Sequence, residues 1–169
     1  MATFFTSDTH FGDHRTINIH RRPFRSANEM DSILIANWNE VVASNDEVWH
    51  LGDVARKPER VAALLAMLNG RKFLIRGNND PEGSMAAPGS QSVGDYAEID
   101  VHGLRLVLCH YPFRSWNGQH RGAINLHGHS HGRLKPLPRQ FDVGVDVRSF
   151  RPVTLQQLLS PSAEVHALP

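Results

Sequence analysis

The stretch NLHGHSHG, residues 125–132, places His127, His129 and His131 at a spacing of two residues, with small residues between them. In an extended segment, residues two apart project to the same side, so His129 and His131 should point towards one place. Gly128 would let the backbone and a bound group approach closely. We expect His127 to pack or to support its neighbours. Since imidazole nitrogens bind borderline metal ions, the stretch predicts a metal site at the end of a strand.

Short apolar runs elsewhere in the chain are typical of strands. The sequence His102-Gly103 between two of them predicts the two-residue turn of a β-hairpin. The predicted strands cover residues 2–8, 46–53, 71–78, 96–101, 104–110, 123–129 and 141–147.

Helical periodicity is clear in two places. Residues 27–43 carry apolar side chains at helical spacing, and Ser26 with Glu29 predicts a capping box at the start. Residues 58–69 begin with proline and end before glycine, as helices often do. A shorter helix is predicted over TLQQLL, residues 154–159.

The order of these elements predicts a layered α/β domain with mixed sheets, over residues 1–169. Strands and helices alternate early in the chain, and the later part is rich in strands. Residues 81–94 are rich in Pro, Gly and Ser and are predicted to be a loop. A mobile surface loop is the favoured interpretation of that segment, and a lid over a site is the alternative.

Composition excludes several classes of protein. The 169 residues carry 18 Lys and Arg against 17 Asp and Glu, so this is not a strongly basic protein that coats nucleic acid. The hydrophobic share of 40% is too high for a disordered chain. The start of the chain does not resemble a signal peptide, and no apolar stretch approaches the roughly 18 residues of a membrane span. We therefore expect a cytoplasmic protein with no membrane partner.

Most predicted strands are followed at once by carboxylate, amide or imidazole side chains. Ligands of α/β proteins bind at the carboxyl ends of strands, and these donors suit borderline divalent ions. Two divalent ions would bring a charge of +4 and two carboxylates a charge of −2. The site would then have a net charge of about +2, which attracts a phosphate ester. One ion would take Asp8, His10 and His131, a second would take Asn78, His110 and His129, and Asp53 could bridge the two.

These donors fall in blocks that resemble the motifs of the calcineurin-like metallophosphoesterase superfamily. The family's blocks, in order, are D-x-H, G-D, G-N-H-[DE], a lone His and G-H-x-H, and here they read SDTHF, LGD, GNND, CHYP and GHSHG. Flanking stretches such as RRPF (21–24) and VGVDV (143–147) are similar to a small bacterial and phage branch. The resemblance covers nearly the whole chain. It implies a four-layer α/β/β/α sandwich and a hydrolase with two divalent ions, manganese being expected and iron, zinc, nickel or cobalt the alternatives.

Two positions depart from the family pattern. Asn79 stands where the family has a histidine that contacts the phosphate and can protonate the leaving group. An amide can hydrogen-bond but cannot supply a proton at neutral pH, so we expect Asn79 to orient a phosphate oxygen. His14 is the candidate general acid, with a solvated loop histidine as the alternative. Arg56 replaces the second acid of G-D-x-x-D-R, and we expect this to change the support of its loop and not the metal site.

The reaction that the resemblance implies is direct hydrolysis of a phosphoester by a hydroxide that bridges the ions. Since members without the histidine resemble phosphodiesterases more, a phosphodiesterase is the first interpretation. A phosphomonoesterase acting on nucleotides or proteins is the second, and a non-catalytic interaction module, which should have lost ligands, is the third. Nucleotides and nucleic-acid ends are among the open substrates, and no oligomeric state is predicted. Arg21, Arg22 and Arg25 could contact an anionic substrate, although a solvated surface is favoured.

Overall fold

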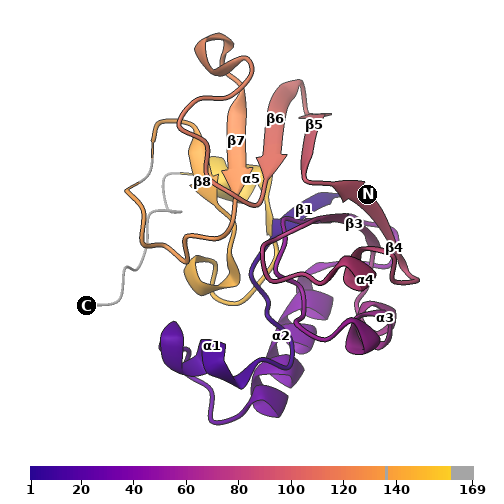
Figure 1. The fold of residues 1–169 in the computed structure, drawn as a ribbon. Coiled ribbons are helices and arrows are strands. Elements are labelled where there is room, and N and C mark those ends of the chain that lie inside the picture. Colours follow the sequence, from indigo (N-terminus) through magenta and orange to yellow (C-terminus); the bar gives the residue numbers. More distant parts are fainter. Residues whose placement is uncertain (136, 161–169) are drawn as a thin grey trace.

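The computed structural model describes residues 1–135 and 137–160, and residues 161–169 of the predicted domain lie outside that part. Two mixed sheets carry the fold (Figure 1). The first has the order β4-β3-β2-β1-β9 and consists of β1 (Thr3–Thr6), β2 (Glu47–His50), β3 (Arg71–Ile75), β4 (Ser90–Gly94) and β9 (Val153–Thr154). The second has the order β5-β6-β7-β8 and consists of β5 (Tyr96–Val101), β6 (Leu104–Cys109), β7 (Ile124–His127) and β8 (Gln140–Asp142).

Each sheet has a parallel centre and one antiparallel edge strand. Strands β1 to β4 run parallel and β9 pairs antiparallel with β1. Strands β6, β7 and β8 run parallel and β5 pairs antiparallel with β6. The carboxyl ends of parallel strands lie at one edge of a sheet, so the segments that follow β1, β2 and β3 are brought together, as are those that follow β6 and β7.

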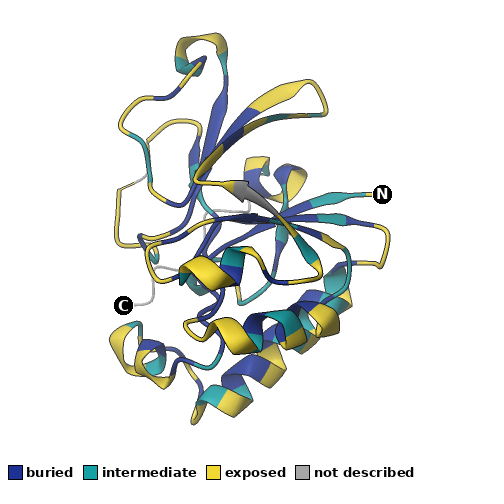
Figure 2. Cartoon of the chain, turned by 45° about the vertical axis from the view of Figure 1, so that its right-hand side comes forward, coloured by how far each residue is buried: buried dark blue, intermediate teal, exposed yellow. Residues whose placement is uncertain are grey.

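Helices α2 (Ala27–Val41) and α3 (Pro58–Met67) cover the outer face of the first sheet and lie beneath it in Figure 1. Helix α4 (Glu82–Met85) contacts α3, and helix α1 (His14–Ile19) lies to the left of α2 in this view. Figure 2 shows that these helices turn buried residues inward and exposed residues outward. Phe4 and Val48 meet Trp38 of α2 in this layer of the core.

The space between the two sheets is a second apolar core. Phe5, Trp49 and Ile75 of the first sheet contact Leu106 and Leu126 of the second. Successive residues of a strand face opposite sides, so Phe4 faces the helices and Phe5 faces the other sheet. This burial on both faces explains why the strands read as nearly continuous apolar runs.

The remaining segments complete the layers. Helix α5 (Leu155–Leu159) turns Leu155 and Leu158 into the core between the sheets. The segment that precedes β7 contains the short 3₁₀ helix η1 (Gln119–Arg121), and Trp116 and Ala123 cover Val107 there.

The predicted α/β class with two mixed sheets is confirmed. Within the described ranges, no helix is both long enough and apolar enough for a membrane span.

Local signals predicted several boundaries correctly. His102 and Gly103 join β5 to β6 with φ angles of 52° and 78°, as a hairpin turn of this length requires. The side chain of Ser26 accepts from the backbone N–H of Glu29 at 3.1 Å. The predicted capping box at this helix is incomplete, because Glu29 accepts from the backbone N–H of Arg25 at 2.6 Å instead of from Ser26.

Two expectations about secondary structure are wrong. Residues 81–94 are not a plain loop, because they form α4 and the edge strand β4. An edge strand pairs through its main chain, so a segment without strand-forming residue types can still join the sheet. Residues 141–147 are not one strand: β8 ends at Asp142, whose Oδ1 accepts from Gly144 N at 2.7 Å, and Val145–Val147 form the 3₁₀ helix η2.

Candidate metal centre

The predicted ligands converge from the ends of five strands. Asp8 and His10 follow β1, Asp53 follows β2 and Asn78 follows β3. His110 follows β6, and His129 and His131 follow β7. The two sheets therefore bring together side chains that are up to 123 positions apart in the sequence.

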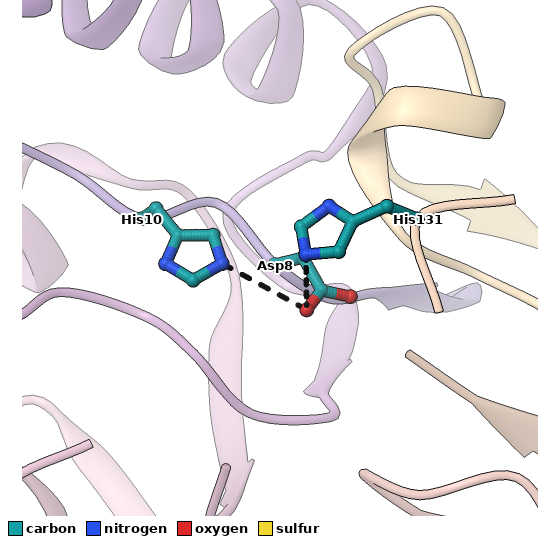
Figure 3. Close-up of side chains that lie close together, drawn as sticks. All are labelled: Asp8, His10 and His131. Atoms are coloured by element: carbon teal, nitrogen blue, oxygen red, sulfur yellow. Dashed lines mark ion pairs between the residues drawn. The ribbon is translucent and has the colours of Figure 1, made fainter. Parts of the chain in front are cut away.

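Asp8, His10 and His131 form the first group (Figure 3). Asp8 Oδ1 lies 3.6 Å from His131 Nε2 and 3.9 Å from His10 Nε2. Both ring nitrogens point at the same carboxylate from different elements. Donors that bind one ion at about 2.1 Å each lie roughly 3–3.5 Å apart, so this group is close to the spacing that a divalent ion needs.

Asp53, His110, Asn78 and His129 form the second group. Asp53 Oδ2 lies 3.6 Å from His110 Nε2 and also 3.5 Å from His10 Nε2, so it faces both groups. Asn78 Oδ1 lies 3.0 Å from His110 Nε2 and 2.9 Å from His129 Nδ1. Asp8 also falls within reach of Asp53 and His110.

The tautomer of His110 supports cation binding at the second group. Its Nδ1 lies 2.8 Å from the carbonyl oxygen of Leu51, which can only accept, so Nδ1 carries the proton. In the neutral ring, Nε2 then presents a lone pair to the amide oxygen of Asn78, which is also an acceptor. A cation between two facing acceptors would satisfy both.

The backbone at the site is strained. Asp8, His10, Asp53, His129 and His131 all have φ between 48° and 66°, in the left-handed region that non-glycine residues rarely adopt. Such residues cost about 1–3 kcal/mol each and persist where the surroundings hold them. The hydrogen bonds Asp8 N to Gly52 O, at 3.0 Å, and His10 N to Asp53 O, at 2.9 Å, do this here.

This geometry corrects the reasoning about His129 and His131. The strand β7 ends at His127, so the two rings are not aligned by the alternation of an extended segment. They reach the site through left-handed turns and enter different groups. His127 is buried, and its Nδ1 lies 2.8 Å from the carbonyl oxygen of Gly128.

Glycine is required at two of the blocks because chains approach closely there. A Cβ atom at Gly128 would lie 2.0 Å from Ser7 Oγ and 2.4 Å from Asp8 Oδ2. A Cβ atom at Gly77 would lie 2.2 Å from Asp53 Oδ1. The glycines before Asn78 and His129 therefore leave space for the two carboxylates.

Burial perturbs the donors at the floor of the site. Burial raises the pKa of Asp8 to about 7, and the charges of His131 and His110 oppose that shift. Burial lowers the pKa of His10 to about 3, so its ring is neutral and able to bind a metal. Asn78 and His129 are exposed, and the site opens to solvent on their side.

The donors present fit a pair of divalent ions. His10 Nε2 is buried and, among the described residues, has no hydrogen-bond partner. Native structures rarely leave a buried ring nitrogen unsatisfied. This atom faces carboxylate oxygens of Asp8 and Asp53 at distances too long for hydrogen bonds, which is the arrangement expected around an ion.

Asp146 and Arg22 support the first group, and neither was predicted to do so. Asp146 Oδ2 accepts from His131 Nδ1 at 2.7 Å, which turns Nε2 towards Asp8. Arg22 donates to both Asp146 oxygens at 2.8 Å and to the carbonyl of Asp8 at 2.6 Å. Burial raises the pKa of the Asp146 carboxyl, but the contacts with His131 and Arg22 outweigh burial and hold this pKa well below its usual range. The prediction of a solvated or substrate-binding Arg22 is wrong, because its side chain is fully buried.

Asp80 and His50 fix the loops that carry the ligands. Asp80 accepts from the backbone N–H groups of Asp53, Val54 and Gly77 at 2.7–2.9 Å. Thr9 Oγ1 donates to the carbonyl of Val54, so it accepts from Nε2 of His50 at 3.0 Å. Nε2 of His50 therefore carries a proton, and the ring is neutral because burial lowers the pKa of His50 to about 3.

His20 is a further residue that sequence reasoning missed. Its ring stacks on that of His131, with centroids 3.5 Å apart and 10° between the planes. Arg133 Nη2 lies 3.2 Å from His20 Nδ1. No sequence signal pointed to it, since a histidine outside any motif gives no information on which ring it contacts.

Of the two residues predicted to act on the substrate, Asn79 contacts the metal centre, and His14 has no recorded contact with it among the described residues. Asn79 is exposed and donates from its backbone N–H and its Nδ2 to the Asp53 carboxylate, at 2.8 and 2.7 Å. His14 is exposed at the first turn of α1, and its ring has no hydrogen-bond partner among the residues that the structure describes. Arg56, exposed after Asp53, lines a cavity with Asn78 and Asn79.

Comparison with known proteins places the chain in a family. The model of the "Calcineurin-like phosphoesterase superfamily domain" matches residues 1–140. The "Uncharacterized protein MJ1445" of Methanocaldococcus jannaschii is 32% identical over 166 residues, covering 92% of this chain and 88% of that protein. The "Gene 66 protein" of Mycobacterium phage L5 is 29% identical over 179 residues, covering 85% of this chain and 86% of that protein.

A solved structure agrees with the fold. The protein AQ665 of Aquifex aeolicus, described as of unknown function, has a TM-score of 0.71 and 21% identity and covers 92% of this chain and 96% of its own. The ordered motifs, their convergence at one edge of two sheets and the family match lead to one conclusion: this chain belongs to the calcineurin-like phosphoesterase superfamily.

Proposed function

We propose that the protein is a phosphoesterase that uses two divalent metal ions and acts by preference on phosphodiesters. The observation that carries this proposal is the pair of donor groups around Asp8 and Asp53. Between the two carboxylates lies the buried Nε2 of His10, which has no hydrogen-bond partner in the part of the chain that the structure describes. Manganese is the ion that we expect. We expect the protein to act in the cytoplasm.

The two groups of donors would each hold one metal ion. Asp8, His10 and His131 would hold one ion, and Asn78, His110 and His129 the other, with Asp53 Oδ2 facing both. When bound, the ions would supply Lewis acidity and make a water nucleophile available at neutral pH. Asp146 and Leu51 fix the tautomers of His131 and His110, so the lone pairs already face inward.

Asn79 is the basis for preferring a diester. Its Nδ2 group and a cation compete for the same oxygen, Asp53 Oδ2, so the amide can turn to a phosphate oxygen of a bound substrate. It orients that oxygen but supplies no proton. A diester with an acidic leaving group needs less help from a general acid, which suits this site. His14, at the start of α1 near Asp13, stays our candidate for a proton donor to poorer leaving groups.

The proposal is tested by metal analysis and a pair of chromogenic substrates. Purified protein should contain about two equivalents of divalent metal, and Asp53→Asn should reduce the metal content. With added Mn²⁺, bis(p-nitrophenyl) phosphate should be turned over faster than p-nitrophenyl phosphate. Asp100→Asn is the matched control, because Asp100 is an exposed carboxylate on β5, away from the donor groups.

The alternatives give different results in the same assays. A large preference for p-nitrophenyl phosphate would support a phosphomonoesterase. Protein that binds two ions but hydrolyses neither ester would count against both phosphoesterase interpretations. Protein that binds no divalent ion and hydrolyses no ester would refute both of them and would support a non-catalytic interaction module.

A further inference from the structure

We propose that the cavity beside Asn79 is a subsite for a second phosphate group of the substrate, recognised by Arg56 and Arg15. This inference rests on the proposed function, since it places the scissile phosphate at the metal centre. It deepens that function by naming the substrate class: esters that carry another phosphate close to the one that reacts.

The cavity adjoins the metal centre and is large enough for such a group. It has a volume of about 390 Å³, within the range of small-molecule sites. Its lining consists of Arg15, Arg56, Asn78, Asn79, Asp80 and Pro81. Asn78 and Asn79 belong to both the cavity and the centre, so a substrate whose reactive phosphate meets Asn79 extends directly into the cavity.

The charge of this cavity favours an anion. Arg56 is exposed and, among the described residues, forms no ion pair. Arg15 donates to Asp13 from Nε and Nη2, which leaves its remaining N–H groups for another partner. Paired guanidinium groups suit the planar, two-point contact that a phosphate accepts.

The one carboxylate of the lining does not cancel this charge at the cavity. Asp80 is buried, and its two oxygens accept from three backbone N–H groups, those of Asp53, Val54 and Gly77. Its contacts are therefore turned into the protein. A neutral group in the cavity would leave Arg56 without an ion-pair partner among the described residues, whereas a phosphate would pair with Arg56 and accept from the donors of Arg15 that Asp13 does not use.

The first test compares two dinucleotides that differ only in a terminal phosphate. Thymidylyl-thymidine and its 5′-phosphorylated form carry the same scissile diester. We expect wild-type protein with Mn²⁺ to prefer the phosphorylated form by about tenfold in kcat/KM, mainly through KM. Arg56→Ala should remove most of this preference, and Arg56→Lys should restore part of it because the charge is kept.

Arg121→Ala is the matched control. Arg121 is an exposed arginine that lines a separate cavity with Leu104, at the amino-terminal end of β6. Its removal changes the net charge equally and should leave both turnover and preference unchanged. A wild-type protein with no preference, or an Arg56→Ala variant that keeps it, would overturn the subsite.

A third substrate identifies the source of the second phosphate. The trinucleotide of thymidine offers an internal phosphodiester next to the scissile one, in place of a terminal phosphomonoester. If it matches the phosphorylated dinucleotide, the subsite accepts the phosphate of a continuous strand. If it matches the plain dinucleotide, the subsite is selective for a terminal phosphate. Either result supports a phosphate subsite.

A binding measurement separates failure of the subsite from failure of the proposed function. Thymidine 3′,5′-bisphosphate is titrated calorimetrically into full-length protein in EDTA, where no turnover occurs. Arg56→Ala should weaken binding about tenfold, and Arg121→Ala should not. Unchanged binding in Arg56→Ala overturns the subsite. Intact binding in a protein that hydrolyses no ester refutes the proposed function alone.

Discussion

Replacement of Asp146 by asparagine should weaken metal binding without removing any predicted ligand. Asp146 accepts the Nδ1 proton of His131 at 2.7 Å and thereby fixes which nitrogen faces Asp8. It also holds Arg22 through two contacts of 2.8 Å. An asparagine keeps the size of the side chain, but its amide can present an N–H group to the ring and it carries no charge for Arg22.

The magnitude follows from these two contacts. Loss of a partner that orients a metal-binding histidine costs about 10–100-fold in metal affinity. That corresponds to about 1.4–2.8 kcal/mol of binding free energy. The guanidinium of Arg22 is fully buried, and a buried charge that loses its partner costs about 3 kcal/mol or more of unfolding free energy.

The two effects are measured separately. Calorimetric titration with Mn²⁺ gives the affinity of each ion, and urea denaturation in EDTA gives the unfolding free energy without metal. Asp100→Asn is the control, since it removes an exposed carboxylate from β5. Unchanged affinity of both ions in Asp146→Asn, in protein that is folded, would refute the idea that Asp146 orients His131 as a ligand.

Three further predictions concern packing, pH and specificity. Gly128→Ala should cost about 1–3 kcal/mol of unfolding free energy in urea denaturation, because its Cβ would lie 2.0 Å from the nearest side-chain oxygen. Gly83→Ala is the control and should change the unfolding free energy little, since the nearest atom to its Cβ would lie at 3.5 Å. Burial lowers the pKa of His50 from 6.5 to about 3, so below pH 6.5 the unfolded chain takes up a proton that the folded chain does not, and stability falls as the pH drops. Between pH 7.5 and 5.5 in EDTA, wild type should lose about 1.4 kcal/mol more than His50→Gln, and equal losses would contradict a buried neutral His50. Asn79→His should raise turnover of phenyl phosphate relative to p-nitrophenyl phosphate, since an imidazole can protonate the poorer phenolate leaving group; a ratio that stays at the wild-type value would show that residue 79 cannot supply this proton.

Signals that are local in the chain predicted much of the fold. The hairpin at His102 and Gly103 and the cap of α2 at Ser26 depend on residues close to each other in the sequence. The apolar runs of β1, β2 and β3 read as strands because both of their faces are buried. Each of these features requires only a few neighbouring residues, so a single sequence reveals them.

Features that depend on main-chain pairing or on turns were missed. Strand β4 consists of SQSVG, which lacks a strand pattern, and it forms because the edge of β3 offers free main-chain groups. The left-handed turns at His129 and His131 could not be foreseen, since a non-glycine residue with positive φ is uncommon even for histidine, which is enriched there. They form because His129 N donates to Asp8 Oδ2 at 3.0 Å and His131 bonds to Asp146.

The set of donors can be read from the sequence, because Asp8, Asp53, Asn78 and the histidines stand in short motifs beside strand ends. Which donors face each other, and what holds them there, depends on how the layers pack. Arg22 and Asp146 are 124 residues apart, and their contact depends on how two sheets and a helix pack. Long-range contacts of this kind leave no periodic trace in the chain, so the support of the site becomes visible only when the layers are assembled.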